Sequence, residues 1–121
     1  MPATPSNPLA EAYFRFLELA QAVRDMASPD AIDANEAALL EAIVLSWHQG
    51  KSLTVREAIE LRHLGSPATL HKRITRLRQK QYLHTYSTAN DRRAKYLYPT
   101  EQALNYFARL GESLQAVKVH A

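Results

Sequence analysis

Hydrophobic positions recur at the three- and four-residue spacing of helices over most of this chain, but two short stretches near position 90 have a different pattern. Both stretches, 82–87 and 94–98, are rich in β-forming residues, and in the second the hydrophobic positions alternate. They predict β-strands, and the turn-forming residues between them join the strands into a hairpin. The helical spacing predicts five helices, over residues 9–27, 34–48, 55–61, 66–81 and 100–118. We therefore expect a mainly α-helical fold with a small β-hairpin.

Polar residues that commonly cap helix N-termini stand at the start of the predicted helices. Asp33 with Glu36, and Thr54 with Glu57, have the spacing of a capping box, in which each side chain accepts the other's backbone N–H. Proline follows the cap at the first and fourth helices, as is typical of the first helical position. The expected cap residues are Asn7, Asp33, Thr54, Ser66 and Thr100.

The order of the central elements indicates a winged helix-turn-helix. A short helix, a turn that contains Gly65, a longer helix and a hairpin follow one another between residues 55 and 98. Further helices flank this arrangement on both sides. We expect residues 1–8 to be a disordered leader and residues 9–121 to form a single domain, with terminal helices 9–27 and 100–118.

Basic residues are concentrated in one part of the chain. Residues 1–61 contain four Lys/Arg against nine Asp/Glu, residues 62–95 contain nine against one, and residues 96–121 contain two of each. A basic block between acidic or neutral segments is typical of a surface that binds a polyanion, although a solvated basic face would give the same count.

The longer helix of the pair is the expected recognition helix, which lies in the major groove of DNA in this motif. Its inward face is predicted to be Leu70, Ile74 and Leu77. Arg76 is placed for phosphate contact. The residues predicted to reach base edges are Ser66, Ala68, Thr69, Lys72 and Arg73.

The hairpin tip, or wing, carries a second candidate group. We expect Arg92 and Arg93 to reach a narrow minor groove, where the negative potential of DNA is strongest, rather than to form a merely solvated turn. Asp91 is the single acid of the basic block, and its expected role is to hold an arginine or cap the turn.

The segments Ser66–Leu83, Asn90–Arg93 and Leu97–Gln102 together resemble the multiple-antibiotic-resistance-regulator (MarR) family. The resemblance covers roughly residues 36–107 and implies a dimeric DNA-binding regulator, with Asp91 and Arg93 matching the family's wing pair. The sequence departs from the family pattern at Gln81 and Ala103, where the family usually or often has glycine. It also has one predicted helix after the wing where the family typically has two.

The spacing of apolar residues in the two terminal helices also favours self-association. In the last helix, Ala103, Phe107, Leu110, Leu114 and Val117 recur at alternating spacings of four and three, as in a coiled-coil seam or a face that covers the domain's own core. The first helix has two apolar stripes, and a small domain has difficulty covering both. The stripes are Leu9/Tyr13/Phe16/Ala20 and Ala12/Leu19/Val23/Met26. These features favour a homodimer.

Other classes of function find little support in the sequence. The chain has no cysteine, its five histidines lack metal-ligand spacing, and it contains no phosphate-binding loop or nucleophile motif. We expect no enzyme activity, no metal and no cofactor, and nothing in the sequence identifies a small-molecule effector. No apolar stretch is long enough for a membrane span and no signal peptide is evident, so a cytoplasmic protein is expected.

We therefore predict a transcriptional regulator that binds double-stranded DNA at a pseudo-palindromic operator as a homodimer. Two alternatives remain open on the sequence. One is a winged-helix module whose basic face binds an acidic protein, and the other is a DNA-binding protein of replication or plasmid maintenance.

Overall fold

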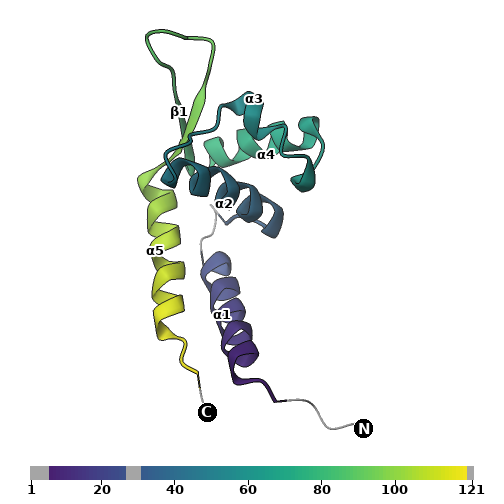
Figure 1. The fold of residues 1–121 in the computed structure, drawn as a ribbon, viewed down its shortest axis with the longest axis vertical. Coiled ribbons are helices and arrows are strands. Elements are labelled where there is room, and N and C mark those ends of the chain that lie inside the picture. The colour runs from purple at the N-terminus through teal and green to yellow at the C-terminus, as the bar shows by residue number, and fades with distance from the viewer. Residues whose placement is uncertain (1–5, 27–30, 120–121) are drawn as a thin grey trace. The chain divides into compact units, whose positions relative to one another are not determined.

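The computed structural model describes residues 6–26 and 31–119, and its elements confirm the expected fold class (Figure 1). Helices predominate, and the two strands form one antiparallel hairpin. The elements are α1 (Pro8–Asp25), α2 (Ala34–His48), α3 (Val55–Ala58), the 3-10 helix η1 (Arg62–Leu64), α4 (Pro67–Gln79), β1 (Leu83–Tyr86), β2 (Tyr96–Pro99) and α5 (Glu101–Ala116).

The described chain divides into two compact units. Ile32–Leu104 form the first, which contains α2, the helix-turn-helix elements and the hairpin. The second consists of the described residues of segments 1–31 and 105–121, with α1 and most of α5. We call these the central unit and the terminal unit.

The predicted helix starts are confirmed, because each expected cap makes its hydrogen bond. Asn7 Oδ1 accepts from Ala10 N–H at 3.1 Å, and Ser66 Oγ accepts from Thr69 N–H at 3.2 Å. Both capping boxes form, and Thr100 Oγ1 accepts from Ala103 N–H at 3.0 Å. Helix ends differ from the prediction by up to three residues. Pro8 belongs to α1 rather than to a leader, and residues 1–5 and 27–30 lie outside the described part.

The core of the central unit forms where α4 packs against α2 and the hairpin. Leu70, Ile74 and Leu77 are buried, as the helical spacing predicted. Leu39, Leu40 and Ile43 of α2 and Leu83 and Leu97 of the strands complete this core. Because one face of α4 is committed to the core, its opposite face is left for solvent or a ligand.

A third segment extends the hairpin, which the sequence did not predict. β1 and β2 pair in antiparallel register from Leu83↔Pro99 to Tyr86↔Tyr96. On the other edge of β2, Thr54 forms a bridge with Tyr96, Val55 N–H donates to the Lys95 carbonyl at 2.9 Å, and Leu97 N–H donates to the Leu53 carbonyl at 2.8 Å. The residues just before α3 are therefore tied to the base of the wing.

The chain leaves α4 through a left-handed residue. Gln81 has φ +64°, a conformation that usually favours glycine, and it stands at one of the positions where this sequence departs from the MarR pattern. The carbonyl of Gln81 accepts from Thr100 Oγ1 at 2.6 Å, and the carbonyl of the neighbouring Lys80 accepts from Gln102 Nε2 at 3.2 Å. These bonds hold the end of α4 against the start of α5.

A buried ion pair joins the other side of this junction to α2. Lys80 Nζ lies 3.0 Å from both carboxylate oxygens of Glu36, whose side chain is 3% exposed, while that of Lys80 is 26% exposed. Glu36 Oε1 also accepts from Asp33 N–H at 3.2 Å. The Glu36 backbone N–H, which donates to Asp33 Oδ1 at 2.7 Å, lowers the pKa of the Asp33 carboxyl, and burial opposes that shift. Lys80, which is not part of the predicted inward face of α4, thus acts inside the fold.

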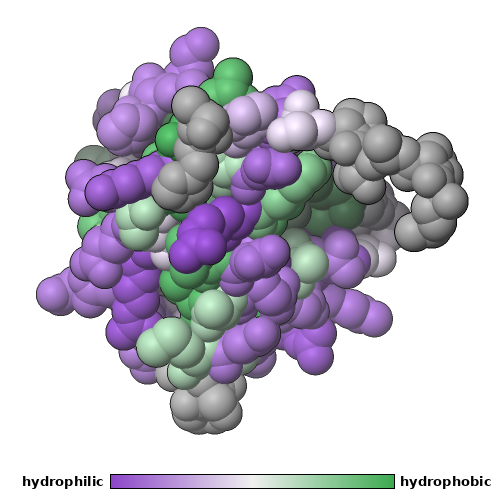
Figure 2. Space-filling view, turned by 90° about the horizontal axis from the view of Figure 1, so that it is seen from below, coloured by the Kyte–Doolittle hydropathy of each residue, from purple (hydrophilic) through white to green (hydrophobic). Residues whose placement is uncertain are grey.

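In the terminal unit, several large apolar side chains remain exposed. Ala20 and Val23 of α1 are buried, but Leu9 is 72% exposed, and Tyr13, Phe14 and Leu17 are exposed as well. Leu114 of α5 is 63% exposed. Figure 2 views the molecule from the end at which α1 begins and α5 ends, and it shows hydrophobic side chains at the surface between hydrophilic ones. The predicted stripes of α1 are therefore only partly covered within one chain.

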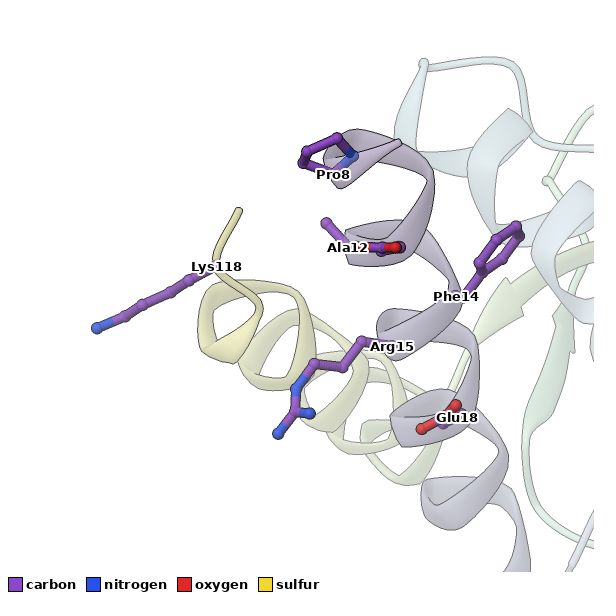
Figure 3. Close-up of a pocket in the computed structure, with 7 residues that line it drawn as sticks. Pro8, Ala12, Phe14, Arg15, Glu18 and Lys118 are labelled. Carbon is purple, nitrogen blue, oxygen red and sulfur yellow. The ribbon is translucent and has the colours of Figure 1, made fainter. Parts of the chain in front are cut away.

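The terminal unit also has a cavity of about 340 Å³ beside α1. Glu11, Arg15 and Glu18 of α1 line it together with Lys118, which follows α5. In the close-up, Arg15 extends to the side of α1 on which α5 lies, and Lys118 points away from α1 (Figure 3). The opposite charges of this lining balance, so the cavity has no clear preference for an ion of either sign.

The ion pair yields a prediction about stability. Lys80→Ala leaves the Glu36 carboxylate buried without its cation, and the free energy of unfolding should fall by about 2–3 kcal/mol. The loss is smaller than for a fully buried pair because a quarter of the Lys80 side chain is exposed. Urea denaturation measures it, and Lys72→Ala on the exposed face of the same helix is the control. Equal denaturation midpoints for the two variants would contradict a stabilising role for the pair.

Candidate nucleic-acid interface

The candidate interface is built on the turn between α3 and α4, which holds α4 at a fixed angle. Gly65 has φ +154°, and a Cβ at this position would lie 3.4 Å from Arg73 Nη1 and 3.4 Å from Leu70 Cδ2. Arg73 Nη1 donates to the Leu64 carbonyl at 3.0 Å. The sequence predicted the turn and its glycine, but not the 3-10 helix η1 or this hydrogen bond from α4 back to the turn.

The exposed face of α4 carries most of the predicted contact residues. Ala68, Lys72 and Arg76 are exposed, whereas Thr69 and Arg73 are half-buried. Ser66, also exposed, donates its hydroxyl to Thr69 Oγ1 at 2.9 Å while it caps the helix. The Ser66 hydroxyl and one N–H of the Arg73 guanidinium are therefore engaged within the chain. Among the predicted residues of α4, Lys72 and Arg76 are the cations whose side chains make no hydrogen bond to another described residue.

The wing presents its two arginines on an ordered turn. Arg92 and Arg93 are exposed. Asp91 Oδ1 accepts from the backbone N–H groups of Arg93 at 3.0 Å and of Ala94 at 3.3 Å, and Asp91 N–H donates to Thr88 Oγ1 at 3.2 Å. Of the two roles expected for Asp91, the structure has it capping the turn.

The structure adds two cations that sequence reasoning did not single out. Arg56 of α3 and Lys95 at the base of the wing line a common recess with Arg93. The pairing of residues 53–55 with 95–97 brings them together across about 40 positions of sequence. The local signal for a third strand is a β-prone stretch at Ser52–Val55, which is too short to predict one from the sequence.

The described part of the chain has neither a cluster of metal-binding side chains nor a helix suited to span a membrane. Among residues 6–26 and 31–119, no three His, Asp or Glu side chains are grouped to hold a metal ion. No helix of that part is long and apolar enough to cross a membrane.

Taken together, the α3–turn–α4 pair and the paired strands define a winged helix-turn-helix protein. No family model and no curated protein matches the sequence. Solved structures do match, and they give the fold as the MarR-like winged helix expected from the sequence.

Three of these structures illustrate the likeness. The transcriptional regulator Tm0710 of Thermotoga maritima is 20% identical, with a TM-score of 0.66 over 88% of this chain and 70% of its own. A mutant of MepR from S. aureus bound to an oligodeoxyribonucleotide is 18% identical, with a TM-score of 0.61 over 88% and 76%. The heme sensor PefR of Streptococcus agalactiae is 20% identical, with a TM-score of 0.56 over 92% and 76%.

The different positions of the α4 arginines yield a second prediction. Arg73→Ala removes the hydrogen bond to the Leu64 carbonyl and should lower the free energy of unfolding by about 1.5–3 kcal/mol, the usual range for a bond that involves a charged group. Arg76→Ala, on the exposed face of the same helix, should leave the denaturation midpoint unchanged. Thermal or urea denaturation of both variants measures this difference. If Arg76→Ala proves to be the more destabilised variant, the assignment of Arg73 to the turn is wrong.

Proposed function

We propose that this protein is a transcriptional regulator that binds double-stranded DNA in a sequence-specific manner, as a homodimer on a pseudo-palindromic operator. The observation that carries the proposal is the exposed basic face of α4, which is free of acidic residues and lies in the same unit as a wing that presents two exposed arginines. A helix with one buried stripe and a basic opposite face suits the major groove.

The solved structures of similar proteins also support this proposal. Tm0710 is a transcriptional regulator, and the MepR mutant was solved with an oligodeoxyribonucleotide. In the proposed complex, α4 enters the major groove with Ala68 and Lys72 facing base edges, and Arg76 binds a phosphate. Arg92 and Arg93 of the wing reach the adjacent minor groove, where the negative potential is strongest.

The homodimer rests on the apolar side chains that the terminal unit leaves exposed. Leu9, Tyr13, Phe14, Leu17 and Leu114 are large, apolar and exposed in one chain. A second copy that covers them would remove this surface from water and place two α4 helices on one duplex. A two-fold symmetric protein then requires an operator whose half-sites are related by the same symmetry.

DNA binding has a distinctive dependence on salt, which tests the proposal. Between 50 and 200 mM salt, affinity for duplex DNA should fall by roughly 10³–10⁵ if six to ten phosphates are contacted. Arg76→Ala should reduce the slope of log affinity against log salt by about one per subunit on every sequence. Lys72→Ala should instead lose more affinity on a duplex selected from a random library than on random DNA. Fluorescence anisotropy measures all three.

The result that would overturn the proposal is a folded wild-type protein that binds neither selected nor random duplex at 50 mM salt. The basic face would then be assigned to an acidic protein partner. Arg109→Ala on α5 is the charge-matched control, and its salt slope should equal that of the wild type.

The dimer is tested separately by its mass. Light scattering at micromolar concentration should give twice the mass of one chain. The double variant Leu17→Gln/Leu114→Gln should weaken dimerisation by at least about tenfold, because each buried leucine contributes about 1.5–3 kcal/mol. Leu45→Gln removes an exposed leucine from α2, whose exposure of 57% lies between those of Leu17 and Leu114, and is the matched control. A wild-type protein that stays monomeric throughout this range would exclude the proposed interface.

A further inference from the structure

We propose that the recess between α3 and the base of the wing binds a phosphodiester group of the DNA backbone, with Arg56 and Lys95 as the principal contacts. This inference rests on the proposed function and adds a site to it. The recess has a volume of about 550 Å³ and is lined by residues 54–56, by residues 93–95 and by Asp91. All of these residues belong to the central unit.

The walls of the recess are held in place by backbone hydrogen bonds. Val55 N–H donates to the Lys95 carbonyl at 2.9 Å, and the bridge between Thr54 and Tyr96 continues the same pairing. Thr54 is fixed in addition by its capping box with Glu57. The two walls therefore form one small sheet edge, and a ligand that enters the recess meets a framework that is already ordered.

The charge of the recess favours an anion. Arg56, Arg93 and Lys95 contribute three positive charges, and Asp91 contributes one negative charge. Asp91 Oδ1 accepts two backbone N–H groups, which offset part of its charge. In the described part of the chain, the side chains of Arg56, Arg93 and Lys95 make no hydrogen bond or ion pair with another residue. These three cations are therefore available to a ligand.

A hydrogen-bond donor is available beside these charges. Thr54 Oγ1 accepts from Glu57 N–H at 3.1 Å, and its own hydroxyl proton has no acceptor among the described residues. A phosphate oxygen accepts both charge-assisted bonds from arginine or lysine and a bond from a hydroxyl. The set of donors thus matches a phosphate better than it matches a base edge, which combines donors with acceptors.

The position of the recess favours DNA as the source of this phosphate over a free anion. α3 packs against α4, so a group bound beside Arg56 lies next to the helix proposed to enter the major groove. Arg93 lines the recess and also belongs to the wing tip. A backbone phosphate between the groove that α4 enters and the groove that the wing enters would meet both walls. Such contacts fix register without reading sequence.

The first test compares charge-neutral variants. Arg56→Gln and Lys95→Gln remove exposed cations that make no internal contact, so both proteins should fold normally. The double variant should reduce the salt slope of DNA affinity by at least about 0.9 per subunit, equally on selected and random duplexes. When salt is raised from 50 to 200 mM, the double variant should therefore lose about threefold less affinity per subunit than the wild type loses. Arg109→Gln should keep the wild-type slope.

A variant with the opposite expected sign strengthens the test. Asp91→Asn removes the negative charge of the recess but keeps a side-chain oxygen that can accept the two N–H groups of the turn. Affinity for DNA should rise by about two- to fivefold at low salt, and the gain should shrink as salt increases. Loss of affinity in this variant would contradict the proposed charge of the site.

Chemically modified DNA locates the phosphate. In a selected duplex, each phosphodiester near the half-site is replaced in turn by an uncharged methylphosphonate. At one position per half-site, the wild type should lose affinity while the Arg56→Gln/Lys95→Gln variant loses none, because the contact is already absent. The inference would be overturned if methylphosphonate substitution changed the affinity of the wild type and of the variant equally at every position.

Inorganic phosphate distinguishes a free anion from DNA. If calorimetry detects phosphate binding that the double variant abolishes, while the salt slope for DNA is unchanged, the recess is a small-anion site and not a DNA contact. If the wild type binds no DNA at all, the proposed function fails first, and this inference fails with it.

Discussion

The burial of the Glu36 carboxylate is the constraint on which the arrangement of the central unit depends. Burying a carboxylate whose side chain is 3% exposed is costly without a cation, and Lys80 supplies that cation at 3.0 Å from both oxygens. Since Lys80 caps the C-terminal end of α4 and Glu36 lies in the first turn of α2, the pair ties that end of α4 to the core. Arg73, in the middle of α4, donates to the Leu64 carbonyl and ties the helix to the preceding turn. Two cations of this segment thus help to hold α4 in place.

This use of cations inside the fold changes how the basic block is understood. The sequence places nine Lys/Arg in residues 62–95, but Lys80 and Arg73 are engaged within the chain, and Arg62 pairs with Glu60 at 3.3 Å. The free positive charge is instead extended by Arg56, which lies outside the block in sequence and beside Lys95 in space. The surface proposed to bind DNA is therefore defined by the fold and not by the run of basic residues.

Features that depend on neighbours in sequence were predictable. The cap residues, the two capping boxes and the buried stripe of Leu70, Ile74 and Leu77 follow from spacings of three and four residues. The ion pair, by contrast, joins residues 44 positions apart, and the pairing of Thr54 with Tyr96 spans a similar distance. No periodicity encodes such contacts. Gln81 shows the same limit. Its φ of +64° belongs to a helix end in which Tyr82 N–H donates to the Leu77 carbonyl at 2.8 Å, and its own carbonyl accepts from Thr100, 19 positions along the chain.

Some side chains of α4 form hydrogen bonds within the chain, and this affects how the protein would distinguish a proposed operator from other DNA sequences. Arginine gives the strongest bidentate contact to guanine, yet the guanidinium of Arg73 is held to the turn, and the hydroxyls of Ser66 and Thr69 bond to each other. Among the residues predicted to reach base edges, this leaves the methyl group of Ala68 and the amine of Lys72 without a partner inside the described part of the chain. A methyl group suits the thymine methyl, and a single amine suits the acceptors of guanine. In the proposed complex, phosphate contacts would then fix much of the register on DNA. The backbone pairing between α3 and the base of the wing would hold those contacts at a constant position relative to α4.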